Sequence, residues 1–95
     1  MKVRLTEAAE ADLEAIGDAI AHTDAQRAEA SIKRLRVAAR SLGRAPKLCP
    51  PISWSAAPRL RKKHAGPYLL LFQLNGDEAL VLRVAHERSG WVSLV

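Results

Sequence analysis

Basic side chains in the second half of the sequence have the chemistry to act on a phosphate group or to bind an acidic partner. They are Arg61, Lys62, Lys63, His64, Arg83 and His86. A histidine can deprotonate a ribose 2′-hydroxyl or protonate a leaving oxygen, and lysine or arginine can stabilise the charge on a phosphorane. All of these residues except Lys62 are candidate groups for RNA cleavage. The alternative role is the binding of phosphates or of an acidic protein surface.

The spacing of Arg83 and His86 argues against one catalytic site that contains both residues. Side chains alternate between the two faces of a strand, and the sequence separation of this pair is odd. The two side chains are therefore expected on opposite faces. A binding role is favoured for the basic residues, and no catalytic residue is assigned.

The charge of the chain is strongly segregated along the sequence. The net charge is +5, yet residues 30–76 carry ten lysines and arginines and no aspartate or glutamate. Such a segment attracts phosphates or an acidic protein. The alternative is a solvated face that is balanced by the acidic first 29 residues.

Several classes of site and location are excluded by composition. Cys49 is the single cysteine, so neither an internal disulfide nor a multi-cysteine zinc site is expected. The three histidines and Cys49 show no metal-ligand spacing, so we expect no metal and no cofactor. The start of the sequence lacks the apolar core of a signal peptide, and no apolar run is long enough to span a bilayer. These features predict a cytoplasmic location without membrane association.

The first half of the sequence predicts a short strand and two helices. Val3 and Leu5 alternate with basic residues, which is typical of a half-buried strand. Helical spacing of apolar residues predicts a helix over about 7–22. A second helix is expected to start at Thr23, which begins a capping-box pattern, and to end at Gly43 as C-cap. The short connection makes the two helices antiparallel neighbours.

An acidic row and a basic row are expected to face each other across this helix pair. Glu10, Glu14 and Asp18 recur along one face of the first helix. The basic residues of the second helix that could meet them are Lys33, Arg34, Arg36 and Arg40.

A proline-rich segment separates the helices from a predicted β-meander. Four prolines over residues 44–58 exclude a helix and a central strand, so we expect an ordered loop in which Trp54 is a packing anchor. Strands are predicted over 59–65, 68–74 and Glu78–His86, with Asn75-Gly76 as the hairpin loop between the last two.

Both faces of this hairpin are apolar. The predicted register pairs Leu71 with Leu80 and Leu69 with Leu82 on one face and leaves Leu70, Phe72 and Val81 on the other. Two helices cover only one face of a sheet. The second face therefore needs a cover, either from the chain's own proline-rich loop and residues 91–95 or from a partner chain.

The order of these elements, together with short matching words, resembles the RelE/ParE superfamily of toxins. The matching words are Leu5-Thr6, Ala8, Ala11-Asp12-Leu13, Ile16, Arg34-Leu35, Leu42, Leu60-Arg61, Gly66-Pro67-Tyr68, Leu70-Leu71-Phe72, Asn75-Gly76-Asp77 and Val81-Leu82-Arg83-Val84-Ala85-His86. The resemblance covers residues 3 to 88. It implies one α+β domain over 1–95, with a short N-terminal strand, an antiparallel two-helix hairpin and a three-stranded antiparallel meander, the helices packing on one sheet face.

The resemblance also implies a function and partners. Members of the superfamily are toxins of type II toxin–antitoxin pairs, each neutralised in a hetero-oligomeric complex by its antitoxin, here a ParD-like protein. ParE-like members inhibit DNA gyrase, and RelE-like members cleave messenger RNA on the ribosome. The segment Arg88-Ser89-Gly90-Trp91 lacks the tyrosine expected of many RelE-like nucleases, so gyrase inhibition is favoured. A non-toxic domain that only binds its antitoxin is the third possibility, because Lys63 and Ala65 depart from the ParE-like pattern.

The predicted antitoxin-binding or target-binding residues combine the basic strand, one face of the hairpin and the C-terminal segment. They are Arg59, Arg61, Lys62, Lys63, Leu69, Leu71, Arg83, His86, Arg88 and Trp91.

Overall fold

The chain folds as an α+β protein whose elements follow the predicted order. The computed structural model describes residues 1–52 and 59–94. Its elements are β1 (Lys2–Leu5), α1 (Glu7–Ala21), α2 (Ala25–Ser41), the 3-10 helix η1 (Pro46–Leu48), β2 (Arg61–Ala65), β3 (Tyr68–Asn75), β4 (Glu78–His86) and the 3-10 helix η2 (Trp91–Leu94).

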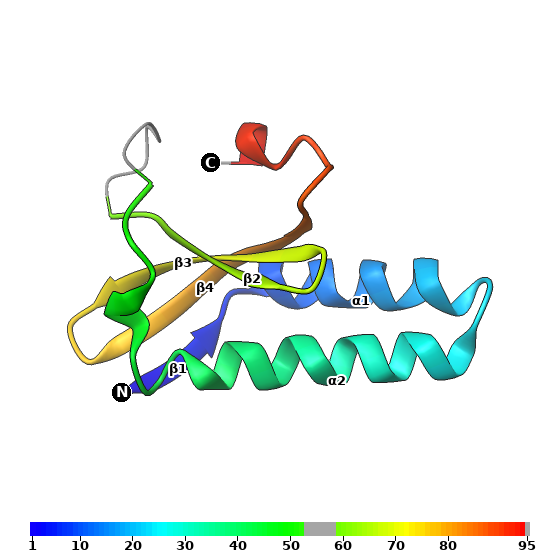
Figure 1. The fold of residues 1–95 in the computed structure, drawn as a ribbon, viewed down its shortest axis with the longest axis horizontal. Helices are drawn as coiled ribbons and strands as arrows, with labels where there is room; N and C mark the ends of the chain where they lie inside the picture. The colour runs from blue at the N-terminus through cyan, green and yellow to red at the C-terminus, as the bar shows by residue number, and fades with distance from the viewer. Residues whose placement is uncertain (53–58, 95) are drawn as a thin grey trace.

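The strands form one four-stranded sheet in the order β1-β4-β3-β2. The meander β2-β3-β4 is antiparallel, and β1 adds to β4 in parallel. Figure 1 shows α1 and α2 side by side on one side of this sheet, with η2 on the other side. Across the described residues, neither helix is long and apolar enough to cross a membrane.

Both helices begin at an N-cap whose side chain accepts a backbone hydrogen bond. Thr6 is the N-cap of α1 and accepts a hydrogen bond from the Ala9 N–H, so the helix begins at Glu7, where the predicted helix over 7–22 begins. The capping box at Thr23 was wrong by one residue, because Asp24 has the extended backbone of an N-cap and accepts from the Arg27 N–H at 3.0 Å. The Thr23 hydroxyl instead donates to the Ile20 carbonyl at the end of α1.

Gly43 is also not the predicted C-cap. Leu42 caps α2 in a right-handed helical conformation, and Gly43 has no positive φ. A Cβ added at Gly43 would lie 2.8 Å from the Met1 carbonyl oxygen. Glycine is therefore needed here for the close approach of the N-terminal strand, not for a left-handed turn.

The larger core lies between the helices and the sheet. It is formed by Ala9, Leu13, Leu35, Ala39, Leu42, Leu70, Phe72, Ala79, Val81 and Val84. Phe72 is fully buried, and burial of a side chain of this size contributes about 2–3 kcal/mol. The predicted placement of Leu70, Phe72 and Val81 on one face of the hairpin is confirmed.

The second face of the sheet is covered by the chain itself. Its cluster consists of Ile52, Leu60, Leu69, Leu71, Ala85 and Trp91. Leu69 and Leu71 are 2% and 0% exposed, so of the two predicted covers the structure shows the one that the chain itself provides. Segments before and after the meander fold over them, and a partner could reach these leucines only by displacing that cover. Trp54 lies outside the described residues.

The predicted pairing of β3 with β4 is wrong in register. Gly76 and Asp77 form the turn, so Asn75 pairs with Glu78 and Gln73 with Leu80. A β-bulge then shifts the register between Leu71 and Phe72, and Leu82 is the extra residue on β4.

Smaller differences concern the segment before the sheet. Arg59 precedes β2 and has a left-handed φ of 68° rather than a strand conformation. The exclusion of helix from residues 44–58 was too broad, because Pro46 starts the short η1 at a position where its missing N–H costs nothing. Pro51 forms an isolated bridge with Arg61.

Candidate partner-binding surface

The basic strand β2 forms the edge of the sheet opposite β1, and its basic side chains alternate between the two faces. Arg61 and Lys63 pair with Phe72 and Leu70, which point into the helix-side core. Lys62 and His64 pair with Leu71 and Leu69, which belong to the opposite cluster. Because directly paired residues share a face, the strand presents two basic residues toward each side of the sheet edge.

Arg61 holds the preceding loop against the strand. Its Nη1 donates to the Cys49 carbonyl at 2.6 Å, and its backbone bridges Pro51. A hydrogen bond from a charged donor is stronger than a neutral one. Arg61 therefore has a structural role, which makes its predicted role in binding difficult to separate from folding.

Lys62 lies over the C-terminal segment. Its ammonium nitrogen is 5.6 Å from the centre of the Trp91 ring, within the range of a cation–π contact. Trp91 is 9% exposed and belongs to the cluster on the second face of the sheet. In this conformation it covers Leu69 and Leu71 and offers little surface to a partner.

His64 is exposed beside an acidic neighbour. Its Nδ1 lies 4.0 Å from Glu87 Oε2, and the two side chains are 59% and 43% exposed. A pair this open contributes little to stability even when the histidine is protonated.

Arg83 is engaged by Asp12 of α1. Its Nε and Nη2 donate to the two Asp12 oxygens at 2.8 Å each, and Asp12 Oδ2 also accepts from the Val84 N–H at 2.9 Å. This hydrogen bonding, followed by the charge of Asp12, outweighs partial burial and raises the pKa of Arg83. The guanidinium is therefore part of the contact between α1 and the sheet.

Asp12 was missed as an important residue, although the sequence holds a signal for it. It lies at i+3 from Ala9 and i−4 from Ile16, on the apolar stripe of α1. A carboxylate on such a stripe needs a donor in the fold. Asp12 and Thr6 provide hydrogen-bond partners for the backbone of β4 at positions beyond the end of β1. The Thr6 hydroxyl donates to the Leu82 carbonyl, and Asp12 accepts from the Val84 N–H.

His86 has a different environment from Arg83. Its ring packs edge-on against Tyr68 with centroids 5.4 Å apart, and its Nδ1 accepts the Arg88 N–H at 3.0 Å. Arg88 itself is exposed. These contacts give His86 a structural role at the end of the strand.

The candidate groups for RNA cleavage are therefore not assembled into one site. Arg61 and Lys63 lie on one face of β2 and His64 on the other, while Arg83 is paired with Asp12 and His86 with Tyr68 and Arg88. Over residues 1–52 and 59–94, no group of three or more His, Cys, Asp or Glu side chains could hold a metal ion.

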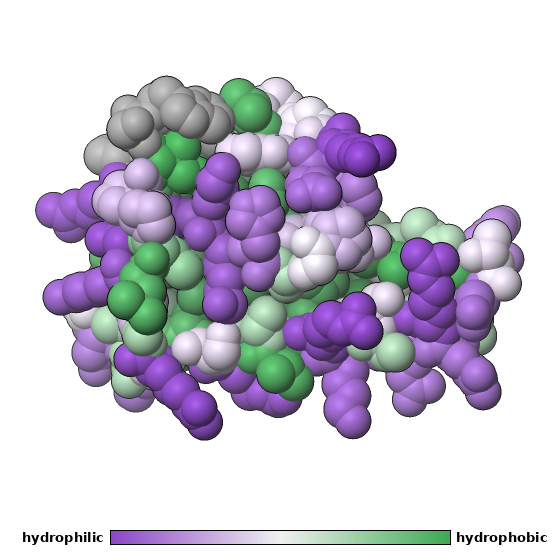
Figure 2. All heavy atoms as spheres, in the orientation of Figure 1, coloured by the Kyte–Doolittle hydropathy of each residue, from purple (hydrophilic) through white to green (hydrophobic). Residues whose placement is uncertain are grey.

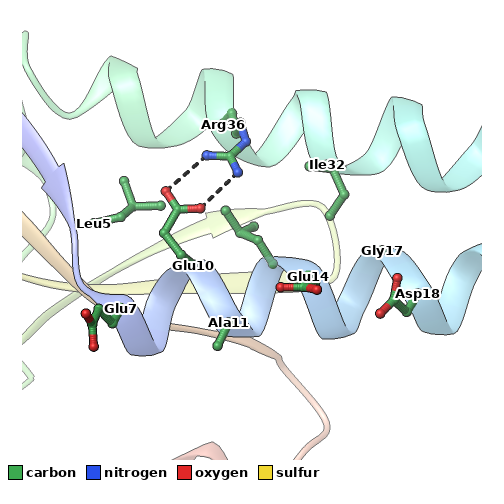
Figure 3. A pocket seen from close by; sticks show the side chains of 10 residues that line it. Leu5, Glu7, Glu10, Ala11, Glu14, Gly17, Asp18, Ile32 and Arg36 are labelled. Carbon is green, nitrogen blue, oxygen red and sulfur yellow. Dashed lines mark hydrogen bonds and ion pairs between the residues drawn. The ribbon is translucent and has the colours of Figure 1, made fainter.

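A groove on the helix side of the molecule carries the opposite charge. A groove of about 660 Å³ between α1 and α2 is lined by Glu7, Glu10, Glu14 and Asp18 above apolar residues such as Leu13. Figure 3 shows Arg36 of α2 reaching across to both oxygens of Glu10, at 3.2 and 2.9 Å. The predicted contact between the acidic and basic rows is thus confirmed for this pair.

The Glu10 to Arg36 contact alters the pKa of both groups. The hydrogen bond from Arg36, aided by its charge and opposed by slight burial, lowers the pKa of Glu10, and the pKa of Arg36 is raised correspondingly. In Figure 2, purple hydrophilic side chains project from the helix hairpin, and green hydrophobic atoms appear in small separate patches.

Comparison with known proteins identifies relatives of this fold. Residues 3–91 match a family described as "ParE toxin of type II toxin-antitoxin system, parDE". No curated protein matches the sequence.

Solved structures with the same fold come from two toxin–antitoxin systems. A chain of the chromosomal ParDE system from P. aeruginosa has a TM-score of 0.79 and 22% identity, covering 90% of this chain and 95% of that one. A chain of the RelBE2 toxin–antitoxin complex from Mycobacterium tuberculosis has a TM-score of 0.67 and 24% identity, with the same coverage of 90% and 95%.

Proposed function

We propose that this chain, which belongs to the ParE family of toxins from type II toxin–antitoxin systems, inhibits DNA gyrase and is neutralised by a ParD-like antitoxin. The single observation that supports inhibition over RNA cleavage is the separation of the candidate catalytic groups. A ribonuclease needs a base, an acid and phosphate-stabilising cations around one scissile bond. Here Arg83 and His86 are engaged by different residues of the fold.

The open edge of β2 supports the second half of the proposal. In the described part of the chain, no strand lies outside β2 past the bridge between Pro51 and Arg61. An extended segment of an antitoxin could therefore add to the sheet at Lys62 and Lys63 through backbone hydrogen bonds. The basic charge of this edge favours an acidic segment over a second copy of the same strand.

A supercoiling assay with purified gyrase tests the proposed target. The purified chain should reduce the conversion of relaxed plasmid to supercoiled plasmid in a dose-dependent manner, and addition of the antitoxin should restore it. Unchanged supercoiling at saturating chain would rule out gyrase as the target. The proposal places this activity in the cytoplasm, where gyrase acts.

Two further measurements separate the other members of the family from this proposal. A translation extract that receives the chain should show intact messenger RNA, whereas cleavage at the ribosome would assign the RelE-like activity instead. Expression of the chain without antitoxin should arrest growth. Normal growth with a folded chain would indicate a domain that only binds its antitoxin.

A further inference from the structure

A second cavity has a basic lining, in contrast to the acidic groove between α1 and α2, and its polar side chains can all donate hydrogen bonds. It has a volume of about 260 Å³ and lies between α2 and the ends of β2, β3 and β4. Its polar lining consists of Arg27, Ser31, Arg34, Tyr68 and His86, and no acidic side chain lines it. The remaining wall is apolar, with Ile20, Leu35 and Pro67 among its residues.

Three of the donors lie on one face of α2. Arg27, Ser31 and Arg34 are spaced at i, i+4 and i+7, which brings their side chains into one row along the helix. Arg34 was expected to meet the acidic row of α1, but it is Arg36 that makes this contact. Within the part of the chain that the structure describes, no hydrogen bond or ion pair engages the side chains of Arg27, Ser31 or Arg34.

The sheet supplies the other two donors from the opposite wall. The edge-on contact of Tyr68 with His86 fixes both rings, and the described residues provide no hydrogen bond to the Tyr68 hydroxyl. His86 Nδ1 accepts the Arg88 N–H, so the hydrogen of the neutral ring lies on Nε2. The His86 ring can therefore donate a hydrogen bond from Nε2 to a ligand in the cavity, but it has no free nitrogen to accept one.

We propose that this cavity binds the phosphate group of a small anionic ligand. Two guanidiniums, two hydroxyls and one imidazole N–H match the many acceptor oxygens of a phosphate, and arginine binds phosphate in a fixed, two-pronged geometry. The volume is several times the roughly 30 Å³ that one water molecule occupies, so a phosphate with part of its ester group fits. The ligand is either free phosphate or a phosphomonoester whose organic part lies on the apolar wall.

Titration of the purified chain with inorganic phosphate and, separately, with adenosine monophosphate tests this site. Calorimetry should show saturable binding at one site per chain, and the NMR signals of His86 and Tyr68 should shift with the same saturation curve. Tighter binding of the nucleotide would identify a phosphomonoester as the ligand, and equal binding would identify free phosphate.

Matched variants distinguish the cavity from general attraction to a basic protein. Arg34→Gln and Arg27→Gln should each weaken binding about tenfold, as expected for loss of one charged hydrogen-bonding partner. Lys33→Gln removes the same charge from an exposed site of α2 outside the cavity and should leave the affinity unchanged. Absence of saturable binding by either ligand, or an equal loss in Lys33→Gln, would overturn the proposal whether or not the chain inhibits gyrase.

Discussion

The two edges of the sheet differ in how their backbone and charges are satisfied. At one edge, β1 covers only the start of β4, and Thr6 and Asp12 then take over its free backbone groups. At the other edge, β2 carries basic side chains and has no neighbouring strand among the described residues beyond Pro51. The part of β4 that β1 leaves uncovered is thus satisfied by the fold itself, whereas β2 has a free backbone edge among the described residues.

This difference separates the charged side chains that stabilise the fold from those that make no ion pair within it. Arg83 is paired with a carboxylate of α1 and shares it with a backbone N–H, so its charge is used inside the molecule. Lys63 has no ion pair within the described residues, and it lies on the open edge. We expect substitutions at the closed edge to affect stability and substitutions at the open edge to affect binding.

The largest effect is expected on the face of the sheet that the C-terminal segment covers. Trp91→Ala should lower the free energy of unfolding by about 3 kcal/mol, because it leaves Leu69 and Leu71 under a cavity or in contact with water. Trp91→Phe keeps an aromatic side chain and should cost less. Urea unfolding measures both, and a wild-type midpoint for Trp91→Ala would show that the C-terminal cover is dispensable.

Asp12→Ala should have the next largest effect and tests the closed edge directly. Loss of the carboxylate leaves Arg83 unpaired and the Val84 N–H unsatisfied, for an expected cost of about 2 kcal/mol. Glu14→Ala, an exposed acid on the same helix, is the matched control and should change stability by less than about 0.5 kcal/mol. Equal effects of the two variants in thermal unfolding would contradict the distinction between the edges.

Loss of charge at the open edge should change binding rather than folding. Lys62→Gln combined with Lys63→Gln should weaken antitoxin binding about tenfold at low salt, or about 1.4 kcal/mol, and reduce its dependence on salt. The control is Lys33→Gln with Lys47→Gln, which removes the same charge at exposed positions elsewhere. Affinities are measured by surface plasmon resonance across salt concentrations. An unchanged salt dependence would remove β2 from the interface.

The smallest effect is expected for the exposed pair of Glu10 and Arg36. Because the Arg36 hydrogen bond lowers the pKa of Glu10, the pair stabilises the fold above the ordinary glutamate pKa. That contribution is lost as the pH falls through the lowered pKa. Both side chains are nearly half exposed, so it should amount to less than about 0.5 kcal/mol. Glu10→Gln should therefore reduce stability slightly at neutral pH and match the wild type in acid, as measured by urea unfolding at both pH values.

Side-chain periodicity was sufficient to predict the two long helices and the four strands, whereas the 3-10 helices η1 and η2 were not predicted. The bounds of β4, the helix-side placement of Leu70, Phe72 and Val81, and the two-helix hairpin all follow from side-chain spacing. What spacing could not predict were features fixed by contacts between distant residues. The sharing of Asp12 between Arg83 and Val84, and the close approach of Gly43 to Met1, join residues that lie far apart in the sequence.

The sequence predicted a basic strand near residues 59–65 but not how the side chains around it are arranged. The sequence located the basic strand, yet it could not show that Arg61 ties down the loop at Cys49 or that Trp91 folds over Leu69 and Leu71. Both facts depend on how segments outside the meander return to it. The donor-lined cavity was likewise invisible, because it combines α2 with residues at the far ends of the strands.

The extra residue Leu82 inverts the alternation of side chains along β4. Ala79 and Val81 point toward the helices before the bulge, and Val84 does so after it, which changes the helix-facing positions from odd to even numbers. A relative that lacks this residue, or carries it elsewhere, would present its final strand residues to the opposite sides. Catalytic or binding roles therefore cannot be transferred between such toxins by aligned position alone, and the location of the bulge has to be matched first.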